Sequence, residues 1–336
     1  MIEVALMSVL ALHAARRRSL ARMFRGLGLL AAWLGVAVAA HAQSADGSHR
    51  QSRDDAWWTG PMLANSADTL PRGHFLIEPY LYDVASKGAD RFGSRAYVLY
   101  GLTDRLTVGL IPIVGYNRIS GGPDSSRVGF ADQILQAQFR LTRFQEGSWL
   151  PTISLLLQET VPTGDYDRLQ RASDGMGQGA WATTVGVNAQ SYFWMPNGRI
   201  LRVRLNLART FASHADVDGA SVFGTGPDFH GRASLGAGYS VDTAFEYSLT
   251  RRWVLALDLF HSHGDATQVI GYDAVSGLPR VPVRMTYASS DAFGYAPAVE
   301  YNFTSRLGVL LVVRLIVGGH NVQRSVTPAI AVNYVY

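Results

Sequence analysis

Apolar and polar residues alternate along most of this sequence, in segments of about ten residues or more that turn-rich stretches separate. Helical periodicity is missing, and after residue 42 no stretch approaches the roughly 18 consecutive apolar residues of a membrane helix. The pattern predicts an all-β chain. Twelve strands are expected, at residues 73–84, 94–103, 105–116, 126–143, 149–161, 178–194, 199–211, 231–249, 252–264, 290–303, 306–318 and 325–336.

The connections between these segments alternate strictly in length. Five are short and six are long, and the longest is "GDATQVIGYDAVSGLPRVPVRMTYASS". Outer-membrane barrels have an even number of strands, tight periplasmic turns at one rim and extended extracellular loops at the other. Residues 73–336 are therefore predicted to form a transmembrane antiparallel β-barrel of about 12 strands. The last segment, "TPAIAVNYVY", would pair with the first, so that no strand edge is left in lipid.

The strand faces support a membrane location. One face is aliphatic, as in Leu106, Val108 and Leu110, and aromatic residues lie in the same phase at both ends of the strands. Those beside short connections are Tyr100, Trp149, Phe193, Trp253, Phe303 and Tyr336, and those near long ones are Tyr116, Phe211, Tyr239 and Phe293. Two aromatic belts around an aliphatic band are typical of a protein that spans a bilayer.

The opposite face is polar, which would be unfavourable in a dry core and instead predicts a hydrated lumen. The lumen-lining candidates are Glu78, Arg95, Gln138, Arg140, Arg202, Arg204, Asp242, Glu246, Asp258, Glu300 and Arg314, with Gln136, Gln158, Asn188, Gln190 and Asn206 in the same phase. Two interpretations stay open. The charges could form a constriction whose transverse field selects polar solutes, or an ion-pair network that packs the interior.

Three prolines fall inside predicted strands, namely Pro79, Pro112 and Pro297. Each removes a donor from the strand ladder, so bulges or local bends are expected there.

Residues 1–42 are predicted to be a signal peptide for Sec export. Arginines precede the apolar run "LGLLAAWLGVAVAA", and "AHAQ" offers small residues at the cleavage site after Ala42. A start at Met23 would leave an ordinary signal peptide, and "RRRSL" is also compatible with a twin-arginine signal. Much of the net charge of +4 lies in this leader, so nucleic acid is not expected as a partner. The expected location is the outer membrane of a Gram-negative bacterium.

Residues 43–72 lack strand alternation and contain the adjacent pair Trp57 and Trp58. This periplasmic N-terminal segment is a candidate plug that enters the lumen. The alternative is a loose segment that meets the periplasmic rim through the two tryptophans.

Catalytic and metal sites have little support. Cysteine is absent, which excludes disulfides and thiolate ligands. His261 and His263 share one side of a strand, with Asp265 beyond them, and two imidazoles with a carboxylate are a candidate metal site. Ser262 beside these histidines suggests, as a second hypothesis, the Ser–His pair of a lipid hydrolase. However, neighbouring strand residues point to opposite faces, and polar residues at the outer rim explain the motif better. Likewise "GMGQGA" at 175–180 lacks the strand–helix setting of a dinucleotide loop, and "DVDG" at 216–219 lacks the further ligands of a calcium loop. No enzyme activity, metal or cofactor is predicted.

The stretches "WWTGPMLANSADTLPRGHFLIEPYLYD", "YVLYGLTDRLTVGLIPIVGY", "LLLQETVPTGDY" and "FEYSLTRRWVLALDL" resemble outer-membrane proteins of the phenol-degradation meta-pathway family. The resemblance spans most of the chain after the leader, and its motifs are turns and strand starts. It implies a barrel connected with uptake of aromatic or other small organic compounds, and it carries no substrate-binding residues over.

The sequence thus predicts an outer-membrane channel for passive uptake of small organic molecules, aromatic ones among them. Its expected partners are the solute, outer-membrane lipids, lipopolysaccharide and the barrel-assembly machinery, which would read Val332, Tyr334 and Tyr336 as an insertion signal. The alternatives are an outer-membrane lipid hydrolase, a non-conducting structural or surface-interaction barrel, and a soluble β-sandwich or periplasmic binding protein. The alternation of loop lengths and the paired aromatic belts argue against a soluble protein.

Overall fold

The computed structural model describes residues 50–274 and 280–336. The expected signal peptide, residues 1–42, lies outside the described residues, as does the start of the segment at 43–72. Within the described ranges, no helix is long and apolar enough to cross a membrane.

The chain divides into two compact units. One unit, Gln51–Phe193 with Ile200–Tyr336, contains the barrel. Of the other, the structure describes Arg50 and Trp194–Arg199, and the latter residues form a turn in which Gly198 N donates to Met195 O at 2.8 Å.

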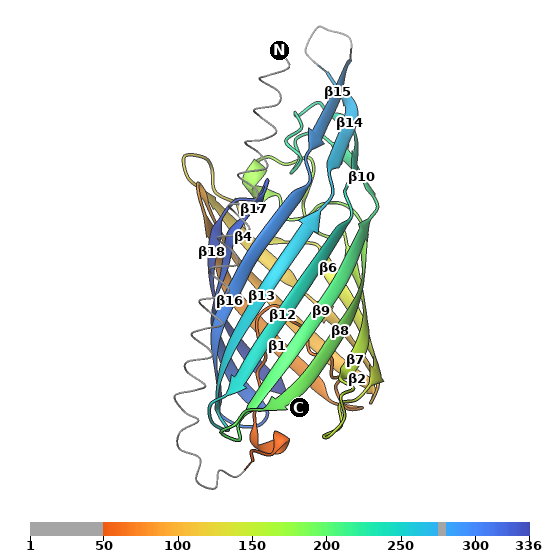
Figure 1. The fold of residues 1–336 in the computed structure, drawn as a ribbon. Coiled ribbons are helices and arrows are strands. Elements are labelled where there is room, and N and C mark those ends of the chain that lie inside the picture. Colours follow the sequence, from red (N-terminus) through yellow and green to blue (C-terminus); the bar gives the residue numbers. More distant parts are fainter. Residues whose placement is uncertain (1–49, 275–279) are drawn as a thin grey trace, which may run out of the picture. The chain divides into compact units, whose positions relative to one another are not determined.

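Almost all regular structure in the described ranges is strand (Figure 1). The elements are the two short 3-10 helices η2 (Arg53–Asp55) and η3 (Ala172–Asp174), and the strands β1 (Phe75–Ser86), β2 (Ala89–Thr103), β3 (Leu106–Ile111), β4 (Ile113–Ile119), β5 (Gly129–Phe130), β6 (Gln133–Thr142), β7 (Thr152–Val161), β8 (Ala182–Trp194), β9 (Ile200–Ala212), β10 (His214–Asp218), β11 (His230–Ser234), β12 (Gly238–Ser248), β13 (Trp253–Gly264), β14 (Thr267–Asp273), β15 (Val281–Tyr287), β16 (Ser290–Asn302), β17 (Leu307–His320) and β18 (Ser325–Val335).

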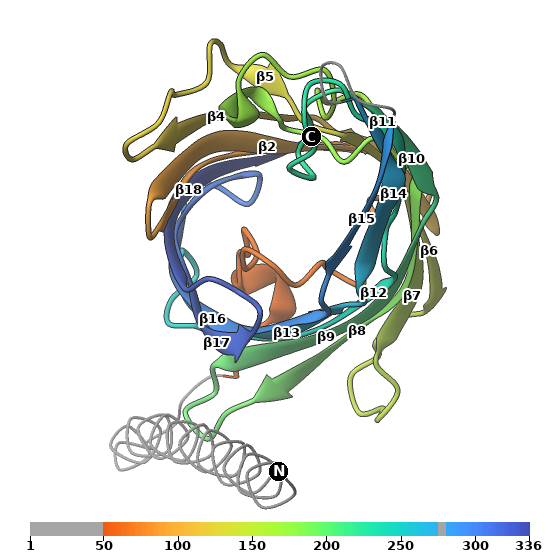
Figure 2. The same cartoon turned by 90° about the horizontal axis from the view of Figure 1, so that it is seen from above.

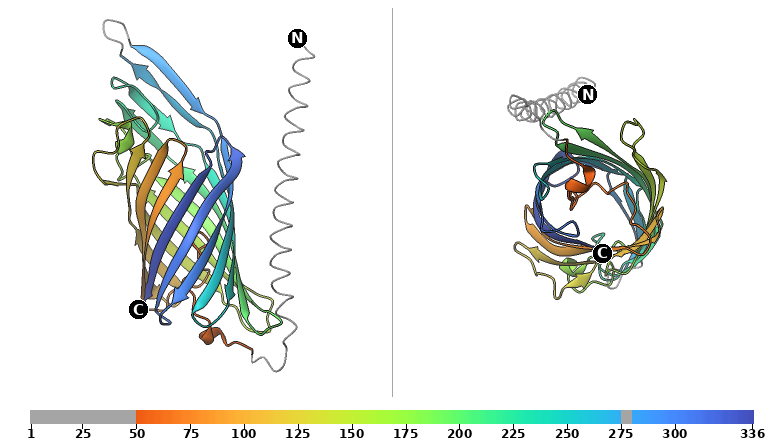
Figure 3. Two further views of the ribbon diagram at one scale, coloured as in Figure 1. Left: turned by 90° about the vertical axis from the view of Figure 1, so that its left-hand side faces the viewer. Right: turned by 90° about the horizontal axis from the view of Figure 1, so that it is seen from below.

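The barrel wall is one closed antiparallel sheet, so the predicted fold class is confirmed. Around the ring the order is β1, β18, β17, β16, β13, β12, β9, β8, β7, β6, β3 and β2, and β2 pairs again with β1 (Figure 2). Phe75 and Tyr336 exchange backbone hydrogen bonds of 3.3 and 2.9 Å where β1 begins and β18 ends. Figure 3 shows the C-terminus at this short-turn rim. Closure leaves no strand edge for lipid to solvate, which a bilayer requires.

Twelve wall strands result because β3 and β4 together act as one strand. Both pair with β2, and Pro112 separates them. Proline has no N–H to donate, and the side chain of Gln133 takes over, accepting from Ile113 N at 2.9 Å and donating to Ile113 O at 3.0 Å. The interruption expected at Pro112 is therefore present.

The other two prolines behave differently. Pro79 stays in register with β2, opposite Ala96, and Pro297 stays in register with β13, opposite Leu257. The register shift in β16 lies between Phe293 and Gly294, so the expectation of a bulge at Pro297 itself is wrong.

The segment 231–249 was expected as one strand and is in fact two, β11 and β12, separated by residues 235–237. β11 leaves the wall and joins β10, β14 and β15 in a separate four-stranded sheet at the long-loop end. That sheet packs on its own core, in which Val217, Phe229 and Val269 are fully buried.

The two faces of the wall separate as the alternation predicts. On β13, Trp253 and Leu255 are 46% and 44% exposed on the outside, whereas Val254 and Asp258 are fully buried on the inside. The aliphatic outer face is flanked at the short-turn rim by exposed aromatic side chains, among them Trp149, Phe193, Phe303 and Tyr336. An apolar band with an aromatic belt suits a bilayer, and the barrel is of the outer-membrane type.

Candidate functional site: the lumen and the N-terminal strap

We call residues 51–72 the N-terminal strap. Its first part, with η2, lies below the short-turn rim in Figure 1, and residues 57–70 contact the inner wall at that end of the barrel. The strap follows the inner wall in the order of the strands (orange in Figure 2). Residues 57–60 bond to β16 and β18, residues 62–65 to β13 and β9, and residues 66–70 to β8, β6 and β3. A sequence without strand alternation can do this because the polar inner wall supplies partners for its backbone.

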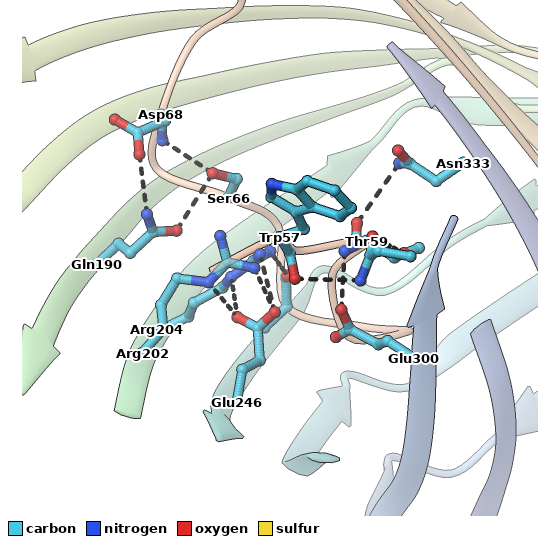
Figure 4. A network of polar contacts seen from close by, with 12 residues as sticks. Trp57, Thr59, Ser66, Asp68, Gln190, Arg202, Arg204, Glu246, Glu300 and Asn333 are labelled. Carbon is cyan, nitrogen blue, oxygen red and sulfur yellow. Dashed lines mark hydrogen bonds and ion pairs between the residues drawn. The ribbon is translucent and has the colours of Figure 1, made fainter. Parts of the chain in front are cut away.

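The first contacts involve Thr59. Its amide donates to Glu300 Oε2 at 2.8 Å (Figure 4). Its hydroxyl donates to Asn302 Oδ1 at 3.1 Å. Asn333 of β18 donates to Thr59 O at 3.4 Å. Glu300 is fully buried by this contact, so its carboxylate binds the strap.

Asp258 binds three successive backbone amides of the strap. Met62 N and Leu63 N donate to Oδ2 at 3.1 and 3.3 Å, and Ala64 N donates to Oδ1 at 3.1 Å. A buried carboxylate is stable only when its oxygens accept hydrogen bonds, and a turn of unpaired amides satisfies it. Asp258 therefore holds the middle of the strap against β13.

Glu246 is the centre of a buried ion triad with Arg202 and Arg204 (Figure 4). Arg202 Nε donates to Glu246 Oε2 at 2.6 Å, and Arg204 Nε lies 2.8 Å from the same oxygen. Arg204 also donates to Ala64 O at 2.8 Å, and the guanidinium of Arg202 lies 4.4 Å from the ring centre of Trp58. These four candidates from the sequence, Trp58 included, are brought together as packing between wall and strap.

The last part of the strap is held by amide side chains. Gln190 donates to Asp68 Oδ2 at 2.9 Å, and Gln138 donates to Ser66 O at 2.9 Å. Arg140 Nη1 lies 3.9 Å from Asp68 Oδ1. Thus the polar inner face of the short-turn half is buried under the strap.

Trp57 lies at the entrance of the strap. Its amide donates to Arg251 O at 3.1 Å and its carbonyl accepts from Asn302 at 3.1 Å, so the residue is fixed between a short turn and β16. The tryptophan pair signalled that this segment meets the barrel. The partners Asn302, Asn333 and Thr107 were missed, because a backbone contact leaves no pattern in the sequence.

The long-loop half of the lumen is different. Arg95 pairs in register with the inward-facing Tyr80, so it faces the lumen, and its side chain is solvent-exposed. Asp242 and Arg314 are half-buried and act on each other electrostatically. Glu78 lies nearer the strap and accepts from Tyr80 Oη at 3.2 Å. Water therefore reaches charged side chains inside the barrel above the strap.

The histidine motif lies on the outer surface. His263 Nδ1 is 2.9 Å and His261 Nε2 is 3.4 Å from Asp291 Oδ1, while Ser262 faces the opposite side of β13. Among the residues that the structure describes, no group of three or more His, Asp or Glu could hold a metal. The glycines at 175–180 lie in a long loop, without a following helix, and 216–218 lie in β10.

Val332, Tyr334 and Tyr336 are exposed on the outer face of the last strand, and the ring of Tyr336 stacks on Phe75 with 5.2 Å between centroids. This arrangement lines the β1–β18 closure with aromatic rings.

Comparison with known proteins agrees with this architecture. A family model described as "Putative MetA-pathway of phenol degradation" matches residues 61–325. No curated protein matches the chain. An outer membrane channel from Pseudomonas putida F1 is 17% identical, with a TM-score of 0.60, and the match covers 82% of this chain and 100% of that one.

Two further solved structures are more distant. The translocator domain of the autotransporter NalP from Neisseria meningitidis is 11% identical with a TM-score of 0.42, over 80% of this chain and 90% of that one. The toluene transporter TodX of Pseudomonas putida is 13% identical with a TM-score of 0.34, over 79% and 89%. The likeness to the Pseudomonas putida F1 channel, at 17% identity, concerns the fold alone.

Proposed function

Because the chain belongs to the phenol-degradation MetA-pathway family, we propose that it is an outer-membrane channel for the passive uptake of small organic molecules, aromatic ones among them. The observation that carries the proposal is Arg95, a charged side chain that is solvent-exposed on the inner face of a closed, lipid-compatible barrel. A wet interior of this kind offers polar solutes a route across the hydrocarbon layer.

In this proposal the strap sets the width of the periplasmic end. It bonds to seven wall strands, and most of the polar side chains beneath it are less than a tenth exposed. The strap fills space that solutes would otherwise cross, so the open path is narrower there than in the long-loop half. Removal or displacement of the strap would widen it.

The experiment is conductance in planar bilayers, with refolded protein that contains or lacks residues 51–70. Steady small conductance of the intact protein and a larger conductance of the deletion variant are expected. Silence of both proteins would overturn the channel and favour the structural, non-conducting barrel. Equal conductance of both proteins would agree with the proposed channel function but would contradict the proposal that the strap narrows the path.

The proposed channel is not an enzyme. A lipid hydrolase would require Ser262 to bond to His261 or His263, but Ser262 faces inward. On the outer face His263 hydrogen-bonds to Asp291, and His261 lies 3.4 Å from the same carboxylate. A Ser262→Ala variant should therefore leave lipid composition unchanged. The expected insertion signal at Val332, Tyr334 and Tyr336, and the contacts with lipopolysaccharide, belong to the same proposal.

A further inference from the structure

The inner face of the long-loop half carries an excess of arginine. Arg91 and Arg95 of β2 and Arg314 of β17 face the lumen, and Arg91 and Arg95 are exposed. Among residues 50–274 and 280–336, no ion pair joins any of the three to a carboxylate. Their contrast with Arg202 and Arg204, which share Glu246, indicates that these guanidinium groups are open to a ligand.

Arg314 is the most enclosed of the three. Its guanidinium lies 4.6 Å from the ring centre of Phe260, and its Nε is buried with no hydrogen-bond partner in the described chain. A buried donor without an acceptor is unfavourable. The nearest opposite charge is Asp242, which acts on Arg314 from beyond ion-pair distance and balances one of the three cations.

Aromatic rings stand between the arginines. Tyr82 pairs with Gly93, midway between Arg91 and Arg95, and its ring covers that glycine so closely that a Cβ would lie 2.6 Å from it. Tyr80 pairs with Arg95, and its ring meets that of Tyr97 edge to face at 6.0 Å. Met62 and Leu63 of the strap pack against the buried cluster that contains Tyr80, as Tyr82 and Tyr97 also do.

Arg95 also lies close enough to Arg314 for the two charges to interact. β1 and β18 separate β2 from β17, which amounts to roughly 14 Å across the wall. Along β17, Arg314 lies four residues nearer the long-loop end than Leu310, which is in register with Arg95 through Tyr80 and Ala331. Long side chains that extend into the lumen from both positions can approach one small anion, and a planar guanidinium matches a carboxylate better than it matches a neutral polar group.

We infer that the outer half of the lumen is a binding site for small aromatic anions, in which Arg95 and Arg314 bind a carboxylate or phenolate oxygen and Tyr82, Tyr97 and Phe260 contact the ring. This inference rests on the proposed channel and names the class of its solute. Arg91, nearer the long-loop rim, attracts the anion toward the site.

The test uses three probes that share one ring: benzoate, neutral benzyl alcohol and the cation benzylammonium. Binding to refolded protein is measured by ligand-observed NMR, and transport by swelling of liposomes that contain the protein. The double variant Arg95→Gln with Arg314→Gln is compared with Arg306→Gln, which removes an exposed arginine in a short turn. Heat-modifiable mobility in gels verifies that each barrel is folded.

The wild-type protein should prefer benzoate to both other probes. The double variant should bind benzoate about tenfold or more weakly, while Arg306→Gln should match the wild type. A second double variant, Arg95→Lys with Arg314→Lys, should keep part of the preference for benzoate because it keeps both positive charges. If the glutamine variant does not fold, this lysine variant tests the anion-binding site.

The outcomes separate the two proposals. Equal treatment of benzoate and benzyl alcohol by a conducting wild-type protein would overturn the anion site and leave the channel. The protein could instead bind benzoate through Arg95 and Arg314 and transport none of the probes. That result would overturn the proposed channel function and support the anion-binding site.

Discussion

At the scale of single residues, three buried carboxylates inside one barrel have different partners. Glu246 is bound by Arg202 and Arg204, whereas Asp258 and Glu300 accept backbone amides of the strap. All three are predicted from the sequence to line the lumen, because each is a polar residue on the inward face of its strand. Only the position of the strap decides which carboxylates meet a cation and which meet a peptide.

Asp258→Ala should release the middle of the strap. Hydrogen bonds to a charged group contribute about 1.5–3 kcal/mol each, so the amides of Met62, Leu63 and Ala64 should exchange with deuterium at least tenfold faster. Mass spectrometry of peptides from residues 57–68 would measure this.

The matched control is Asp132→Ala. Asp132 also binds two backbone amides, those of Gly164 and Gln178 at 3.0 and 2.7 Å, but in a long loop. It should change exchange in that loop only. Unchanged exchange of the strap in Asp258→Ala would contradict the role assigned to the carboxylate.

Glu246→Ala should destabilise the barrel by about 3–5 kcal/mol, because it leaves Arg202 and Arg204 buried without a counter-charge. Urea titration of the folded band in gels would report the loss. Glu159→Ala serves as control, since Glu159 is only partly buried and accepts a single hydrogen bond from Thr183 at 2.6 Å. Equal midpoints for the two variants would mean that the triad adds no stability.

At the scale of elements, the wall strands could be predicted and the strap could not. A strand with one face in lipid and one in water carries its pattern in its own residues, as Trp253, Leu255 and Asp258 do in β13. The strap has no such period, because its order comes from bonds to distant wall residues such as Gln190 and Thr107. Predicting it requires knowledge of the lumen it fills.

The same reasoning explains the error at 231–249. Alternation continues through β11 and β12, because each strand has one covered face. That face of β11 packs on Phe229 and Val269 in the separate sheet, whereas that of β12 is directed into the barrel. Periodicity reports that a face is covered and does not report what covers it. The three lumenal arginines were only partly recognised for a similar reason, as Arg91 lies beyond the predicted start of its strand.

Tyr336→Ala should lower the amount of assembled barrel in the outer membrane severalfold, if the last strand carries the insertion signal. Tyr336 is exposed and stacks on Phe75 across the closing seam. Phe303→Ala is the matched control, because Phe303 is an exposed aromatic residue at the same rim outside the last strand. The heat-modifiable fraction on gels gives the measure. Equal loss in both variants would indicate a general belt effect rather than a signal.

At the scale of the whole barrel, closure divides its surface into three environments that no single strand has. The outer face meets lipid, the inner face of the long-loop half meets water, and the inner face of the short-turn half meets the strap. Because the chain contains no cysteine, one introduced thiol can report each environment without a background.

Cysteine scanning with a membrane-impermeant maleimide, on protein in lipid vesicles, tests this division at three positions. Ser262→Cys, inward in the long-loop half, should react, whereas Leu205→Cys, 39% exposed on the outer face, should be shielded by lipid. Asn188→Cys, inward and 1% exposed beneath the strap, should react only after residues 51–70 are deleted. Labelling of Asn188→Cys in the intact protein would mean that water passes the strap freely, and labelling of Leu205→Cys would mean that the outer face does not meet lipid.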